Sequence, residues 1–154
     1  AKGLEGPILA YDGIAIIVHP SNKVSDLSLE TIAKIYTGEI KNWKDVGGKN
    51  EEIIAFQRNV GSGSQSMLKR FMDGTPIMKA PTEQVNDMMS GIIERVSDYK
   101  NKTNSIGFSF RYYLEGIIKN SNVKMISMLV NIADKKEQVK TVFWKDRIIC
   151  IILL

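Results

Sequence analysis

Arg58-Asn59-Val60-Gly61-Ser62-Gly63-Ser64-Gln65-Ser66-Met67-Leu68-Lys69-Arg70-Phe71-Met72 is a turn rich in glycine and serine that runs into an amphipathic segment. The apolar run 53–56 precedes it and predicts a buried strand. Met67, Leu68, Phe71 and Met72 recur at helical spacing and predict the buried face of a helix. The stretch therefore predicts a strand, a glycine-serine turn and the start of a helix.

Such an arrangement suits an anion. The first N–H groups of a helix have no partner within the helix, and the helix dipole favours negative charge there. Gly61 and Gly63 remove Cβ atoms that would keep an anion from the backbone. Ser62 and Ser64 can donate hydroxyls, and one of them can cap the helix. Arg58 carries a fork of donors that matches phosphate or carboxylate.

Other interpretations of this turn must be weighed. Gly-Ser-Gly-Ser alone is most often a flexible turn, and a nearby arginine is most often solvated. No Gly-Lys-Ser/Thr follows at P-loop spacing, so the turn is not predicted to be a P-loop. The turn also lacks the Gly-x-Ser-x-Gly pattern of a nucleophile elbow.

Length and charge set broad limits. A chain of 154 residues is long enough for one ordinary domain, and its 44% apolar and 25% charged content is typical of a soluble globular protein. The net charge of +4 is mild, and the lysines are spread along the chain without interleaved aromatics. Nucleic acid is therefore not a predicted partner, whereas the mild positive field would help to steer a small anion.

The residues that bind metals or attack substrates are sparse. Cys150 is the only cysteine and His19 the only histidine, so neither a disulfide framework nor a thiol metal site is predicted. The beginning of the chain has no apolar stretch typical of a signal peptide, and no run reaches the length of a membrane span. We expect either a cytosolic protein or one whose leader has been removed.

Strand and helix patterns alternate along the chain. The β-branched run 14–18 predicts a buried strand, and a helix follows from about residue 29 to 36, capped by Ser28 or Asp26 and ended by Gly38. Further elements are a helix capped by Thr82 (82–89), a second helical stretch (92–99), a strand (106–110), a helix (112–118), a strand (123–130) and an apolar end that could be a final buried strand (148–154). This alternation predicts an α/β fold with a central sheet.

Four motifs, in the same order, resemble the solute-binding proteins of bacterial phosphate ABC transporters. They are Asp12-Gly13-Ile14-Ala15-Ile16-Ile17-Val18-His19-Pro20-Ser21-Asn22, the segment 27–36 with Thr37-Gly38-Glu39-Ile40 and Asn42-Trp43, the signature Arg-x-x-Gly-Ser-Gly-Thr/Ser at 58–64, and Ile106-Gly107-Phe108. Together they cover roughly residues 8 to 130. The resemblance implies a type II periplasmic-binding fold, in which two α/β lobes hold the ligand in the cleft between them.

The resemblance also implies roles for individual residues. Arg58 would make charge-assisted bonds to phosphate oxygens, while Ser62, Gly63 and Ser64 would offer N–H groups and hydroxyls. Ser64 stands where the family usually has threonine, which keeps the donor. Val60 stands where relatives often have an acidic or polar residue, so a salt bridge from that position to Arg58 is absent.

Members of this family are much longer than 154 residues. Their first-lobe anion loop, and the aspartate that accepts the proton of hydrogen phosphate, lie upstream of the segment matching Asp12, and residues 1–11 are too few to hold them. We therefore expect one lobe with a central mixed sheet flanked by helices: a remnant of the hinge and lobe one (1–13), the second lobe (14–118), and a segment returning to lobe one with a divergent apolar tail (119–154). Half of a site should bind phosphate weakly.

The expected function is capture of inorganic phosphate outside the cytoplasm, in the periplasm or anchored by lipid to the cell surface, for the membrane permease of an ABC importer. No enzyme activity, cofactor or metal is expected. One alternative is an interaction or structural domain that kept the fold and lost the ligand. A second is a serine hydrolase with Ser62 or Ser64 as nucleophile and His19 as base. The exposed lobe face and the apolar tail also predict self-association.

Overall fold

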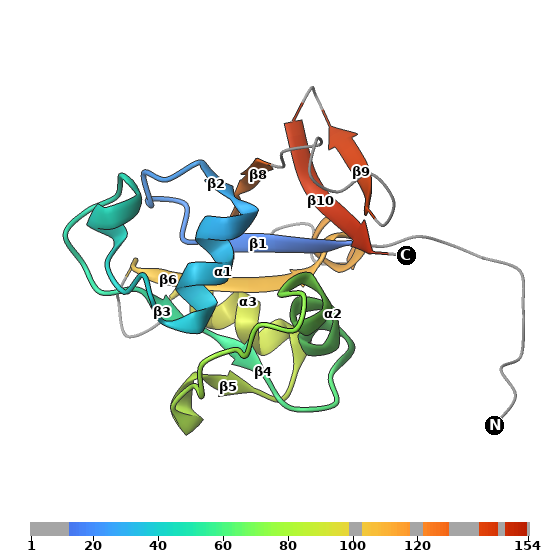
Figure 1. Cartoon of the computed structure of the whole chain (residues 1–154), viewed down its shortest axis with the longest axis horizontal. Coiled ribbons are helices and arrows are strands. Elements are labelled where there is room, and N and C mark those ends of the chain that lie inside the picture. Colours follow the sequence, from blue (N-terminus) through green and yellow to red (C-terminus); the bar gives the residue numbers. More distant parts are fainter. Residues whose placement is uncertain (1–12, 99–102, 118–121, 130–138, 145–146, 154) are drawn as a thin grey trace, which may run out of the picture.

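The computed structural model describes residues 13–98, 103–117, 122–129, 139–144 and 147–153 (Figure 1). Its centre is a six-stranded sheet with the order β3-β6-β1-β10-β9, and β7 also pairs with β1. The strands are β1 (Ile14–Val18), β3 (Ile54–Ala55), β6 (Ser105–Phe110), β7 (Lys124–Met125), β9 (Val139–Trp144) and β10 (Arg147–Leu153). β3 runs parallel to β6 and the other pairs are antiparallel, so the sheet is mixed.

β1 lies in the middle of this sheet, and all five of its side chains are buried. Its β-branched residues suit a strand that is covered on both faces. Its register with β6 runs from Ile14 opposite Phe110 to Val18 opposite Ile106. This register places the end of β1 beside the beginning of β6.

Two pairs of very short parallel strands extend the structure outside the main sheet. β2 (Asp26–Ser28) pairs with β8 (Ser127–Leu129), and β4 (Gln57–Arg58) pairs with β5 (Val85–Asn86). The second pair matters most here, because β4 leads directly into the turn before the second helix.

The helices α1 (Leu29–Thr37) and α3 (Met89–Ser97) cover opposite faces of the main sheet (Figure 1). On one face, Tyr36 of α1 packs edge-on against Phe108, with ring centroids 5.8 Å apart. On the other face, a Cβ atom at Gly107 would lie 2.8 Å from Val96 of α3, so this glycine permits the close approach of the helix. α2 (Gly63–Phe71) lies at one end of the sheet, near the carboxyl end of β6.

Several predicted elements are confirmed. The predicted strands 14–18 and 106–110 are β1 and β6, and the predicted helices after Ser28 and after the glycine-serine turn are α1 and α2. Ser28 rather than Asp26 caps α1, and Gly38 ends it with a φ of +81°. Trp43, in the 3₁₀ turn η1 (Trp43–Val46), is buried and donates from Nε1 to the carbonyl of Asn104 over 2.7 Å.

The helix predicted for 82–89 is wrong. Thr82–Gln84 form only a 3₁₀ turn, η2, whose N-cap is Pro81 rather than Thr82. The chain then becomes extended in β5, because Val85 and Asn86 pair with Gln57 and Arg58 of β4. Pairing with a distant strand thus overrides the local helical pattern. The helical stretch predicted for 92–99 is confirmed over residues 92–97, which belong to α3 (Met89–Ser97), and its last residue is outside the described residues.

The strand predicted for 123–130 is two strands, β7 and β8, which belong to different sheets. The end of the chain forms the hairpin β9–β10, and Ile151 of β10 lies opposite Ile14 of β1. A final strand is therefore confirmed, whereas the burial of its side chains is outside what the structure describes. The helix predicted for 112–118 is η3 (Tyr113–Ile117), which has π-helical hydrogen bonding. The boundary at residue 119 stays a prediction, as does the role of residues 1–13.

Candidate anion-binding site

The turn between β4 and α2 brings the predicted site residues together. The N–H of Ser62 donates to the carbonyl of Asn59 over 3.2 Å and closes this turn. Gly61 adopts a φ of +100°, and a Cβ atom there would meet nothing within 4 Å. The glycine is therefore needed for the backbone conformation and not for space.

Ser62 is the N-cap of α2. Its backbone is extended, and its Oγ accepts from the N–H of Gln65 over 3.2 Å. Its carbonyl accepts from the N–H of Ser66 over 3.0 Å. Of the N–H groups in the first turn, which have no intrahelical partner, those of Gly63 and Ser64 remain to bind a ligand. The first turn of α2 contains no acidic residue, so its positive dipole end is not offset there.

Arg58 lies against this helix start. Its Nε donates to Ser62 Oγ over 3.4 Å, so the guanidinium reaches the cap. Its Nη1 is buried and has no hydrogen-bond partner among the described residues. Burial lowers the pKa of Arg58, and the charges of Asp87 and Tyr113 act in the opposite direction. A buried donor without an acceptor is costly, and an anion at this place would satisfy it.

Two glutamines hold the site in place, and neither was predicted to be part of it. Gln65 Oε1 accepts from the backbone N–H of Arg58 over 2.9 Å, and Gln65 Nε2 donates to Gln57 Oε1 over 3.1 Å. Gln57 Nε2 in turn donates to the carbonyl of Met78 over 2.9 Å. Both side chains are buried. A signal was present in the sequence: Gln65 precedes Leu68 by three residues, so it is a polar residue on the apolar face of α2.

The five predicted residues differ in their exposure. Gly61 and Gly63 are exposed, Arg58 and Ser62 are half-buried, and Ser64 is only 1% exposed. Ser64 Oγ lies 3.2 Å from Ser62 Oγ, so one of these hydroxyls donates to the other. The structure thus places all five between the end of β4 and the start of α2, and their contacts with a ligand stay a prediction. Val60, in the same turn, is 86% exposed.

The serine hydrolase alternative is contradicted by the geometry. A Cβ atom at Gly63 would lie 3.6 Å from the ring of Phe110, so the start of α2 is beside the carboxyl end of β6. His19 follows the end of β1 that pairs with Ile106, at the beginning of β6. Ile106 and Phe110 are roughly 13 Å apart along β6 at the usual rise of a strand, so His19 and the start of α2 lie at opposite ends of this strand. His19 Nδ1 is 2.7 Å from Ser21 Oγ. The only histidine of the chain therefore cannot serve Ser62 or Ser64 as a base.

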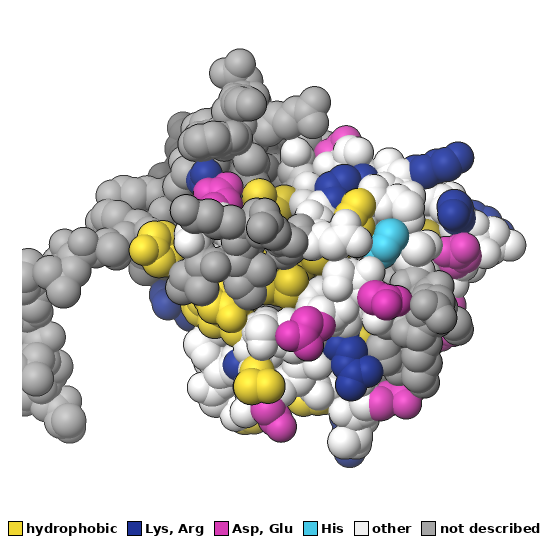
Figure 2. Space-filling view, turned by 180° about the vertical axis from the view of Figure 1, so that it is seen from behind, with side chains coloured by type: hydrophobic (Ala, Val, Ile, Leu, Met, Phe, Trp, Pro, Cys, Tyr) yellow, Lys and Arg dark blue, Asp and Glu magenta, His cyan; other side chains and the backbone are white. Residues whose placement is uncertain are grey.

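Within the part of the chain that the structure describes, no group of three or more His, Cys, Asp or Glu residues could hold a metal ion. No helix there is both long and apolar enough to cross a membrane. On the face in Figure 2, basic side chains (dark blue) and acidic side chains (magenta) are interspersed.

A family model described as the PBP superfamily domain matches residues 7–144. The chain belongs to the PBP superfamily. Among curated relatives within it, the phosphate-binding protein PstS of Borreliella burgdorferi is 31% identical over 128 residues, which are 83% of this chain and 46% of that protein. The phosphate-binding protein PstS of Bacillus subtilis is 35% identical over 94 residues, or 60% of this chain and 31% of that protein.

Solved structures of the superfamily agree. One is a putative phosphate ABC transporter substrate-binding protein from Clostridium perfringens with bound phosphate, which has a TM-score of 0.65 and 32% identity over 77% of this chain and 46% of its own. Another is an ABC-type phosphate transport receptor from Vibrio cholerae, with a TM-score of 0.65 and 32% identity over 78% and 47%. The predicted family resemblance and α/β fold are confirmed. The chain spans less than half the length of these relatives.

Proposed function

We propose that this chain binds inorganic phosphate and supplies about half of the binding site of the solute-capture component of an ABC phosphate importer. The observation that carries this proposal is the buried Nη1 of Arg58, which has no partner among the described residues and lies beside the capped start of α2. Relatives that match this chain are named phosphate-binding proteins, and one solved relative contains bound phosphate.

In this proposal, each residue binds phosphate without reacting with it. The guanidinium of Arg58 makes charge-assisted hydrogen bonds to two phosphate oxygens. The N–H groups of Gly63 and Ser64 bind further oxygens, aided by the dipole of α2. Ser62 Oγ already accepts two N–H groups, so it donates its own proton to Ser64 Oγ, and the hydroxyl of Ser64 keeps its proton for the anion. No covalent bond is formed or broken, so the proposed role involves no enzyme activity and needs no cofactor.

The partners and location belong to the same proposal. A solute-capture protein hands its ligand to a membrane permease, so it acts outside the cytoplasm, in the periplasm or anchored to the cell surface. Because the chain spans less than half of its relatives, the remaining contacts to phosphate would come from the first lobe. We expect this chain on its own to bind phosphate weakly, because the ligand keeps part of its hydration.

Calorimetric titration with phosphate, with sulfate as a competitor, tests the proposal. Arg58→Ala should weaken binding by about 10- to 100-fold, the usual worth of hydrogen bonds to a charged group. Lys69→Ala is a matched control, because it removes one positive charge from the last turn of the same helix, and it should leave the affinity unchanged. Unchanged binding by folded Arg58→Ala protein would contradict the proposal. A folded wild-type chain that takes up no phosphate at millimolar concentration would favour a ligand-free interaction domain instead.

A further inference from the structure

We propose that Asn86 is a further phosphate-binding residue, which donates a hydrogen bond from its side-chain Nδ2 to the anion held by Arg58. This inference rests on the proposed function, because it assigns a new residue to the same site. Neither the glycine-serine motif nor the family signature at 58–64 includes Asn86, which lies 28 positions beyond Arg58 in the sequence.

The pairing of β4 with β5 brings Asn86 to the site. The two strands are parallel, and Arg58 and Asn86 are direct partners in their register. Paired residues on neighbouring strands project their side chains to the same side of the sheet. The backbone continues the contact, because the N–H of Asn59 donates to the carbonyl of Asn86 over 3.3 Å. The side chain of Asn86 therefore starts beside that of Arg58.

The amide of Asn86 has a donor to spare. The residue is 8% exposed, and its Nδ2 is buried without a hydrogen-bond partner in the part of the chain that is described. A Cβ atom at Gly91 would lie 3.4 Å from Asn86 Oδ1, so the amide oxygen faces α3. The NH₂ group is on the opposite side of the amide carbon and is directed away from Gly91. The Oδ1 of Asn59 also lacks a partner among the described residues, so Asn86 Nδ2 does not donate to it.

Two donors on paired residues both lack a hydrogen-bond acceptor, and a single bound anion could supply it to both. Arg58 Nη1 and Asn86 Nδ2 are both buried, both unsatisfied, and carried by paired positions. A buried NH₂ group without an acceptor is as unfavourable as other unsatisfied donors, and native proteins rarely keep it without a reason. A phosphate ion has enough oxygens to accept from the guanidinium, the start of α2 and the Asn86 amide together. Because the amide is neutral, it adds a donor without adding charge.

The test compares two substitutions of equal chemistry by phosphate calorimetry. Asn86→Asp keeps the shape of the side chain but replaces the donor with a negatively charged acceptor, so it should weaken phosphate binding by about 10-fold or more. Asn50→Asp is the matched control, because it makes the same charge change at an exposed residue outside the proposed site. Asn50 precedes β3, whereas Arg58 follows β3. The affinity of this control should equal that of the wild type. Circular dichroism establishes that both variants are folded.

A second measurement needs no variant. In the wild-type protein, phosphate should shift the NMR signals of the Asn86 side-chain NH₂ group together with the amide signals of Gly63 and Ser64. If those two amides shift while the Asn86 NH₂ signals and the Asn86→Asp affinity do not change, the inference is overturned and the proposed function stands. If wild-type protein binds no phosphate, both are overturned. If Asn86→Asp does not fold, the wild-type NMR titration decides.

Discussion

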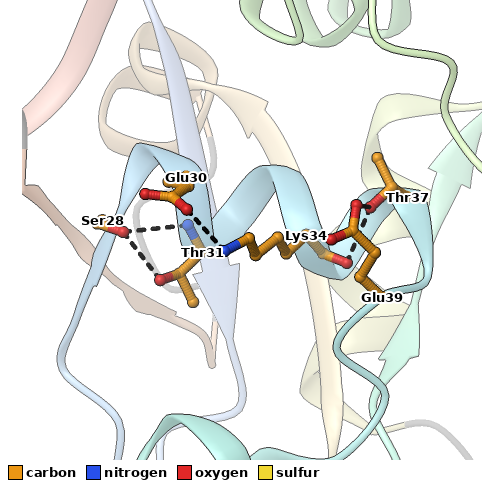
Figure 3. Close-up of polar contacts among 6 residues, drawn as sticks. All are labelled: Ser28, Glu30, Thr31, Lys34, Thr37 and Glu39. Carbon is orange, nitrogen blue, oxygen red and sulfur yellow. Dashed lines mark hydrogen bonds and ion pairs between the residues drawn. The ribbon is translucent and has the colours of Figure 1, made fainter.

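The first two helices of this chain begin in almost the same way, yet only one of them is a candidate anion site. α1 and α2 are each nine residues long, and a serine caps each of them. Ser28 Oγ accepts from the N–H of Thr31 over 3.0 Å (Figure 3), and Ser62 Oγ accepts from the N–H of Gln65 over 3.2 Å. A serine cap is therefore not what distinguishes a binding site from an ordinary helix start.

The difference lies in the charges around the cap. The first turn of α1 contains Glu30, whose carboxylate meets Lys34 at 2.6 Å (Figure 3). The negative charge of Glu30 thus interacts favourably with the positive end of the α1 dipole. The first turn of α2 contains no acid, and the guanidinium of Arg58 lies against its cap with Nη1 unsatisfied among the described residues. Because the first turn of α2 supplies no counter-charge, we expect an external anion to complete this site.

The largest effect is expected when α2 is made to resemble α1. Ser64 and Glu30 are both the second residue of their helices, so Ser64→Asp places a carboxylate where α1 has one. It should weaken phosphate binding by at least about 100-fold, because juxtaposing like charges costs several kcal/mol. Calorimetry measures the affinity, and circular dichroism checks the fold, since Ser64 is buried.

The reciprocal change is the control for this experiment. Glu30→Gln removes the acid from α1 but supplies no arginine, so it should neither create a second phosphate site nor alter the first. Wild-type affinity in folded Ser64→Asp protein would show that the anion does not bind at the start of α2. A second stoichiometric site in Glu30→Gln protein would show that a capped helix start is sufficient without Arg58.

Much of this comparison could be predicted from the sequence, because its signals are local. A capping serine, a glycine that ends a helix and an apolar face all act within a few residues. The end of α1 at Gly38 and the helix after the glycine-serine turn were therefore predicted correctly, and Ser28 was one of the two predicted caps of α1. The β-branched run of β1 was equally clear, because a strand buried on both faces needs no alternation.

What could not be predicted depends on pairing between distant residues. The segment 82–89 has helical spacing, but pairing with β4 makes Val85 and Asn86 extended. The same pairing places Asn86 beside Arg58, and no pattern in the sequence near either residue predicts this pairing. The bonds of Gln65 to Arg58 and Gln57 also arise only when β4 packs against α2. In each case, contacts between residues far apart in the sequence decide the local structure.

A smaller effect separates the two glycines of the turn. Gly61→Ala should lower the free energy of unfolding by about 1–2 kcal/mol, because its φ of +100° is strained for a residue with a Cβ atom. Gly63→Ala is the matched control: it is the first residue of α2, and its Cβ would make ordinary contacts with Phe110. It should leave stability unchanged or raise it slightly, since alanine suits a helix better. Urea denaturation measures both, and equal losses would contradict the backbone argument.

The smallest effect tests the comparison of α1 with α2 most directly. Ser28→Ala and Ser62→Ala each remove one cap, so each should lower the free energy of unfolding by about 1 kcal/mol. Only Ser62→Ala should also weaken phosphate binding, by about fivefold, because of the two caps only Ser62 contacts Arg58 and helps to hold its guanidinium beside the anion. Urea denaturation and calorimetry on the same two samples give both quantities.

Equal losses of stability in both variants, with a loss of affinity in Ser62→Ala alone, would show that a serine cap stabilises both helices but contributes to phosphate binding only at α2. A loss of affinity in both variants would mean that phosphate binding follows the overall stability of the fold and not the contacts at the start of α2.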